Sequence, residues 1–226
     1  MPTFVNNSEL QQLALQASQN SELTSGRKMR DWTFYHYKDF YGTTGQNGVG
    51  RGVTLDPTIE FFRNPQGSRK AVTNYEIVTG QEYHNVITSA KADEPMLVTS
   101  LAVRLDVGKY HWTTTESGVT IDHFTSDDER FYDYNNIMKS GRFVLKVNNQ
   151  EVADYAPIGI LGERVALDAS NISNFYSKIA PIQIAPYILM EEGITVTAEI
   201  LFEKGFVCSC PIRLGVEIIC FKFFKA

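Results

Sequence analysis

The stretch from Leu97 to Val107, LVTSLAVRLDV, indicates the fold class because its apolar and polar residues alternate. Successive side chains of a β-strand point to opposite faces of the sheet, so a period of two predicts a strand with one apolar face. The predicted apolar face consists of Leu97, Leu101, Val103, Leu105 and Val107, and the polar face consists of Ser100, Arg104 and Asp106.

The same period recurs along most of the chain after Asp31. Further strands are predicted over residues 32–37, 53–61, 71–78, 119–124, 143–147, 182–190, 194–202 and 212–218. The connections between them are uneven and several are long, which favours Greek-key or jelly-roll wiring over an up-and-down barrel. We therefore predict an all-β fold, a single antiparallel β-sandwich of jelly-roll type over residues 31–226.

Two local features refine this prediction. The Asn148-Asn149 step offers a turn after the strand over residues 143–147. After Ile218 the apolar parity changes, since Ile219, Phe221 and Phe223 fall on the opposite parity around Lys222. A bulge, or a strand buried on both faces, would explain the change.

Residues 1–30 are predicted to form a helix and an arm in front of the sandwich. Leu10, Leu13, Ala14 and Ala17 follow the spacing of one helix face, and Ser8 is placed to cap the start. The apolar stripe is narrow, so this helix is expected to dock on a neighbouring subunit rather than build a core. The predicted subunit contacts are Leu10, Leu13 and Ala17 in the helix and Phe221, Phe223 and Phe224 in the tail.

The charge and hydropathy of the chain narrow its partners and its place of synthesis. A formal net charge of -5 and a pI near 5.4 argue against nucleic acid as the main partner. The short basic cluster at Arg27, Lys28 and Arg30 is interpreted as a solvated entry to a strand. The N-terminus shows no secretory signal pattern, and no apolar run is long enough to cross a bilayer. The three cysteines are too few and too clustered for a disulfide framework, so synthesis in a reducing cytoplasm is expected.

Two loop-like stretches could be read as a phosphate-binding site and a calcium site, but a plain loop is favoured for both. The glycine-rich segment Gly42–Gly52 has no GK[ST] and is followed by a β-pattern, so a surface loop is favoured over a phosphate cradle. Carboxylates gather between Asp122 and Asp133, where Asp127, Asp128 and Glu129 are the candidate calcium ligands. They lack the D-x-[DN]-x-[DN]-G spacing, and a solvated loop is the favoured interpretation.

Catalytic and zinc-binding patterns are weak as well. The four histidines at 36, 84, 111 and 123 are scattered without an H-x-H or H-E-x-x-H pair. The cysteines at 208, 210 and 220 lie in apolar strand patterns, so packing in the core is favoured over a metal site. No G-x-S-x-G elbow occurs, while a carboxylate pair from distant strands stays open. We predict a non-enzymatic protein without a cofactor.

The C-terminal half resembles a known class of structural proteins. The likeness is carried by Lys139–Asn148, Ala156–Leu161, Ile179–Ile188 and Gly193–Phe202, in which strands, loops and a proline-containing edge strand alternate. This rhythm is similar to that of the jelly-roll coat proteins of tailless icosahedral bacteriophages, including lipid-containing ones. The resemblance implies a capsid subunit in the virion, assembled with identical subunits as a trimer or higher. Other virion proteins, and in lipid-containing phages an inner membrane, are the further implied partners.

Two other functions remain open at this point. A carbohydrate- or receptor-binding β-sandwich, as in an adhesin or a phage spike, would use aromatic residues such as Tyr35, Tyr37, Trp112 and Tyr134 to stack on sugar rings. A glycosidase or a cupin-like metal enzyme could also use such a sandwich. A cupin needs clustered histidines with a carboxylate, which the sequence does not show.

Overall fold

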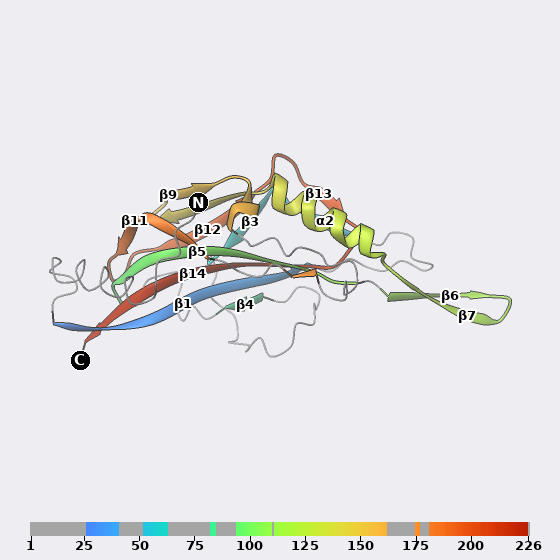
Figure 1. The fold of residues 1–226 in the computed structure, drawn as a ribbon, viewed down its shortest axis with the longest axis horizontal. Helices are drawn as coiled ribbons and strands as arrows, with labels where there is room; N and C mark the ends of the chain where they lie inside the picture. Colours follow the sequence, from blue (N-terminus) through green and yellow to red (C-terminus); the bar gives the residue numbers. More distant parts are fainter. Residues whose placement is uncertain are drawn as a thin grey trace.

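The computed structural model describes residues 26–40, 52–62, 82–84, 94–109, 111–161, 175–176 and 181–225. These residues form several antiparallel sheets with one α-helix, which confirms the predicted all-β class (Figure 1). The predicted helix with Leu10, Leu13 and Ala17, the predicted strand over 71–78 and most of the glycine-rich loop lie outside the described residues. Among the described residues, no helix is long and apolar enough to cross a membrane.

The larger sheet is built on three long strands. These are β1 (Arg27–Phe40), β14 (Ile212–Lys225) and β5 (Met96–Val107), with β14 in the middle. The short strand β4 (Glu82–His84) pairs with β1, and β10 (Phe175–Tyr176) and β11 (Ile182–Met190) pair with β5. Strand β1 begins at Arg27, so the basic cluster is part of the strand rather than of an arm in front of it.

The second sheet has the order β3 (Thr58–Phe61), β12 (Val196–Leu201), β8 (Arg142–Val147), β9 (Gln150–Tyr155). The predicted strand over 53–61 is split at Asp56-Pro57 into β3 and β2 (Val53–Leu55), and β2 pairs with β13 (Phe206–Cys208). Proline has no N–H to donate to a ladder, which explains the break. The predicted turn at Asn148-Asn149 is confirmed, because both residues have positive φ, 50° and 63°, in the hairpin between β8 and β9.

Both sheets contribute to one continuous apolar core. Leu101 of β5 and Val216 of β14 belong to the same buried cluster as Phe143 of β8 and Ile200 of β12, and all four are almost completely inaccessible to solvent. Burial of this kind supplies most of the stabilising free energy of a β-protein. The alternation in the sequence thus correctly predicts the inward face of β2, β3, β8, β12 and the part of β14 up to Ile218.

The change of parity at the end of β14 arises because this strand is buried on both faces, and not because it contains a bulge. Cys220 stays in phase with the core, whereas Phe221 and Phe223 are buried on the opposite face, so β14 is buried on both faces. The register skips Thr99 of β5, which places the bulge in the partner strand. The bulge moves Leu97 to the face of Phe221, so the predicted grouping of Leu97 with the core face of β5 is wrong.

The acidic stretch after Asp122 is not a loop, which corrects the sequence-based interpretation. Residues Asp127–Ser140 form helix α2, followed after β9 by the short 3-10 helix η2 (Ile158–Leu161). Ser126 and Glu129 form a capping box, in which the Ser126 hydroxyl accepts from the Glu129 N–H and the Glu129 carboxylate accepts from the Ser126 N–H. Ile137 and Met138 bury the other end of the helix in the core.

A two-stranded hairpin precedes α2 and projects from the body of the molecule (Figure 1). It consists of β6 (His111–Glu116) and β7 (Val119–Phe124), which pair with each other and with no other described strand. Ser117 and Gly118 close it with φ of 51° and 80°, the left-handed conformations that a tight hairpin turn requires. We call residues 111–124 the hairpin arm.

Candidate interaction surface

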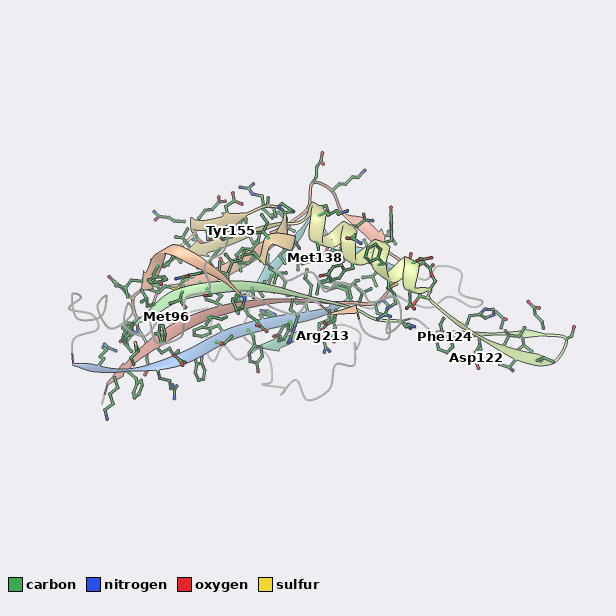
Figure 2. All side chains as sticks on the ribbon, in the orientation of Figure 1. Met96, Asp122, Phe124, Met138, Tyr155 and Arg213 are labelled. Carbon is green, nitrogen blue, oxygen red and sulfur yellow. The ribbon has the colours of Figure 1, made fainter. Side chains whose placement is uncertain are left out.

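The hairpin arm carries apolar side chains that the rest of the described chain does not cover. Val119 is 62% exposed and Phe124 58%, and Figure 2 shows Phe124 and Asp122 on the arm, away from the core. Register pairs Val119 with Glu116 and Ile121 with Thr114, so these four residues share one face of the ribbon. An isolated two-stranded hairpin is marginally stable in water, so a partner surface would stabilise the arm.

Further exposed apolar side chains lie on the first half of α2. The large apolar or aromatic side chains exposed between residues 119 and 132 are Val119, Ile121, Phe124, Phe131 and Tyr132. Several exposed apolar side chains within one stretch of chain favour a contact surface there, whereas single exposed ones are ordinary. The arm and the start of α2 are therefore the candidate interaction surface of this chain.

Arg130 anchors the base of this surface to the end of β5. Its side chain is buried, and its Nε and Nη2 donate to the carbonyl oxygen of Val107 at 3.1 and 2.8 Å. Its Nη1 pairs with Asp127 Oδ1 at 3.1 Å, and Lys109 Nζ lies 3.2 Å from the same oxygen. The start of α2, and with it the root of the arm, is thereby held to the larger sheet.

The predicted calcium ligands do not converge on one point. Glu129 serves the helix cap, Asp127 is in ion pairs with Lys109 and Arg130, and Asp128 is exposed on the first turn. No group of three or more histidine, cysteine or acidic side chains among the described residues could hold a metal ion. The three residues act instead at the helix N-terminus, where negative charge is favourable.

The cysteines pack in the core as predicted. Cys208, Cys210 and Cys220 are free and buried in the main apolar cluster. Burial and the nearby Asp133 raise the pKa of the Cys208 thiol, and that of Cys210 to about 12. Because the thiolate is the reactive form, these thiols are poor nucleophiles. Asp133 is itself buried on α2, where its Oδ2 accepts from the Cys210 N–H at 2.9 Å.

A small pocket lies between α2 and η2, on the helix half that is remote from the arm. Its volume is about 110 Å³, and Tyr134, Met138, Lys139, Pro157 and Ile160 contribute to its lining. The lining is largely apolar, with Ile160 49% exposed and Lys139 exposed in the last turn of α2. No sequence pattern indicated this pocket, because it forms between segments separated by β8 and β9.

A group of buried polar residues lies on the face of the larger sheet that points away from the second sheet. Arg213 and Asp39, which are 1% and 0% exposed, form a two-pronged ion pair with Nε–Oδ1 and Nη2–Oδ2 distances of 2.7 and 2.8 Å. Figure 2 places Arg213 on the side of the sheet that faces away from Met138 and Tyr155. Sequence analysis missed this pair, because the two residues are 174 positions apart.

Tyr37 and Glu217 extend this group along the sheet. The Tyr37 hydroxyl donates to Glu217 Oε1, and Arg104 Nη1 lies 3.8 Å from the same oxygen. Burial and the Glu217 carboxylate raise the pKa of Tyr37. A Cβ at Gly215 would overlap the ring of Tyr37, so glycine is needed where that ring crosses β14. Tyr37 is buried, which removes it from the aromatic residues that could stack on a sugar ring at the surface.

Asp106 belongs to the same group and has a raised pKa. Burial raises its pKa to about 6, against the opposing effect of Arg104 and Arg213, and the Asp39 and Glu217 charges add to the rise. Its buried Oδ2 has no hydrogen-bond partner within the described ranges. The native state therefore retains a proton that the unfolded chain releases near pH 4.

We expect the native-state stability attributable to Asp106 to be fully present below about pH 4 and lost as the pH rises through about 6. The loss is roughly 2–3 kcal/mol, since one pKa unit corresponds to about 1.4 kcal/mol. The Asp106→Asn variant should lack this change and be the more stable protein at pH 7.5. Urea unfolding of both proteins between pH 4 and 7.5 measures the difference. A difference that does not change with pH would contradict this assignment.

The predicted contact residues of the tail pack mostly against other residues of the same chain. Phe223 is 1% and Phe221 7% exposed, packed with Leu97 and against Met29 and Tyr187. Phe224 is half-buried, and Arg30 lies over its ring at 5.5 Å. These phenylalanines therefore have partners within the chain and leave little surface for another subunit.

The histidines do not come together as a catalytic or metal site in the part of the chain whose side chains are described. His36 is buried, and its Nδ1 accepts from the Phe62 N–H at 2.9 Å. His123 lies on the arm, with Nε2 at 2.8 Å from Thr114 Oγ1. His36 and His84 are register partners of β1 and β4, although the His84 side chain is not among those described.

No family model matches the chain, and no curated protein matches it significantly.

Proposed function

We propose that this protein is a non-enzymatic structural subunit of a virion, a coat protein of jelly-roll type that assembles with identical subunits into a phage shell. The proposal requires a compact β-core, a surface for neighbouring copies and no catalytic group. Its location would be the capsid, with synthesis in the host cytoplasm.

The pairing of the strands supports a jelly-roll sandwich. A jelly roll is a long β-hairpin wrapped on itself, so its first strand pairs with its last, its second with the next to last, and so inward. The antiparallel pairs here are β1 with β14, β3 with β12, β5 with β11 and β8 with β9. Neighbouring pairs join through β14 with β5 and through β12 with β8, which yields two four-stranded groups around one core.

The observation that carries the proposed assembly is the exposed apolar hairpin arm. It lies between β5 and β8 in the chain and projects beyond both sheets (Figure 1). In the single chain the arm leaves Val119, Ile121 and Phe124 exposed. Contact with another copy through the face that carries Val119 and Ile121 would bury both side chains and would stabilise the arm at the same time.

Light scattering coupled to size-exclusion chromatography, with electron microscopy of the same fractions, tests the proposal. We expect a trimer or a larger closed assembly at micromolar concentration, because shells need several contacts per subunit. A folded monomer at every concentration up to the millimolar range would contradict the proposed function.

A further inference from the structure

We propose that the hairpin arm of one copy docks into the pocket between α2 and η2 of a second copy, with Glu116 of the arm paired to Lys139 of the pocket. This inference rests on the proposed self-assembly and specifies the surfaces that meet. The arm supplies an apolar face with one acidic residue near its tip, and the pocket supplies an apolar lining with one basic residue.

The arm presents these groups on a single face. Glu116 is the register partner of Val119, and Thr114 is the partner of Ile121, so the carboxylate lies beside the apolar pair. Glu116 and Val119 flank the Ser117-Gly118 turn, which places them at the tip of the projecting ribbon. The first groups to meet a neighbour are therefore one carboxylate and two branched apolar side chains.

The pocket has the complementary chemistry. Met138 and Ile160 provide apolar surface, and Lys139 carries the positive charge. Gly159 lets η2 approach α2 closely, since a Cβ there would lie 3.0 Å from the Met138 carbonyl oxygen. A negatively charged group would interact favourably with Lys139, and apolar groups would pack favourably against Ile160, which is half exposed.

A second copy of the chain is the occupant that this geometry favours over the chain's own arm. Helix α2 begins three residues after the arm ends and runs away from it for fourteen residues, about 21 Å at 1.5 Å per residue (Figure 1). The pocket is at the far half of that helix, whereas the tip of the arm points the other way. A contact from arm to pocket joins two different surfaces of the chain, so it is either reciprocal in a two-fold dimer or continues head to tail into a ring or a shell.

Charge reversal tests the pairing. Glu116→Lys and Lys139→Glu should each weaken association by roughly tenfold or more, because each juxtaposes like charges. The double variant Glu116→Lys/Lys139→Glu should recover association to within about threefold of the natural chain, as coupled residues in contact do. Sedimentation velocity over a concentration series measures the association, and thermal melts confirm that each variant is folded.

Matched controls separate this contact from general charge effects. Glu151→Lys on β9 and Lys204→Glu after β12 make the same charge changes at exposed sites away from the arm and the pocket, and should leave association unchanged. On the arm itself, Val119→Thr/Ile121→Thr should weaken association, whereas Thr120→Val on the other face should not.

The outcomes distinguish this inference from the proposed function. If the natural chain assembles and both single charge reversals assemble normally, the inference is overturned and the proposed function stands. Loss of assembly in the single variants without recovery in the double variant overturns the pairing of Glu116 with Lys139. A natural chain that is monomeric at all concentrations overturns the proposed function, and the inference with it.

Discussion

Replacing Asp39 with alanine is expected to lower the free energy of unfolding by about 3–5 kcal/mol. The substitution leaves the buried Arg213 guanidinium without its two-pronged partner, and an uncompensated charge in the interior is strongly destabilising. Denaturant unfolding at pH 7 measures the loss. Removing both charges, as in Asp39→Leu/Arg213→Met, should cost less than removing Asp39 alone, since the Arg213 charge is removed together with its partner.

The chain offers a matched control for this prediction in an exposed ion pair. Arg142 and Asp154 also pair across neighbouring strands, with Nε–Oδ1 at 2.8 Å, but both side chains are nearly half exposed. Asp154→Ala should therefore cost no more than about 1 kcal/mol. Equal losses for Asp39→Ala and Asp154→Ala would show that burial does not set the strength of the pair, contrary to our expectation.

The second large effect is expected from Phe143→Ala, at about 3–5 kcal/mol. The ring of Phe143 is completely buried, and removing it leaves a cavity between the two sheets. Because the sheets share one core, the loss should also appear in the larger sheet. In a Trp112→Phe background, the fluorescence of Trp32 on β1 reports on that sheet alone.

The expected result is that Phe143→Ala moves the Trp32 transition and the far-ultraviolet transition together to lower urea. Coincident transitions by two probes indicate one cooperative unit. Val152→Ala on β9, where the residue is 39% exposed, is the control and should change stability by less than about 1 kcal/mol. If the Phe143 substitution leaves the urea midpoint of the Trp32 transition unchanged, the two sheets unfold as separate units.

The sequence pattern does not predict helix α2, and the reason is physical. Two of its four buried residues are polar, Arg130 and Asp133, so the apolar stripe expected of a helix is broken. Their burial is satisfied by the Val107 carbonyl and the Cys210 N–H, which belong to distant parts of the chain. The local signal that could have found the helix is the capping box at Ser126 and Glu129.

What the sequence determined by itself is the presence of strands with alternating apolar residues, β5, β7, β12 and β14 among them, and the turn at Asn148-Asn149. Both depend on local geometry, since a strand's two faces and a turn's backbone angles follow from neighbouring residues. Only the tertiary structure decided that Leu97 leaves the core face, that Asp39 meets Arg213, and that the hairpin arm stays uncovered. Each of these depends on which distant segments come together, and a local sequence pattern does not specify such long-range contacts.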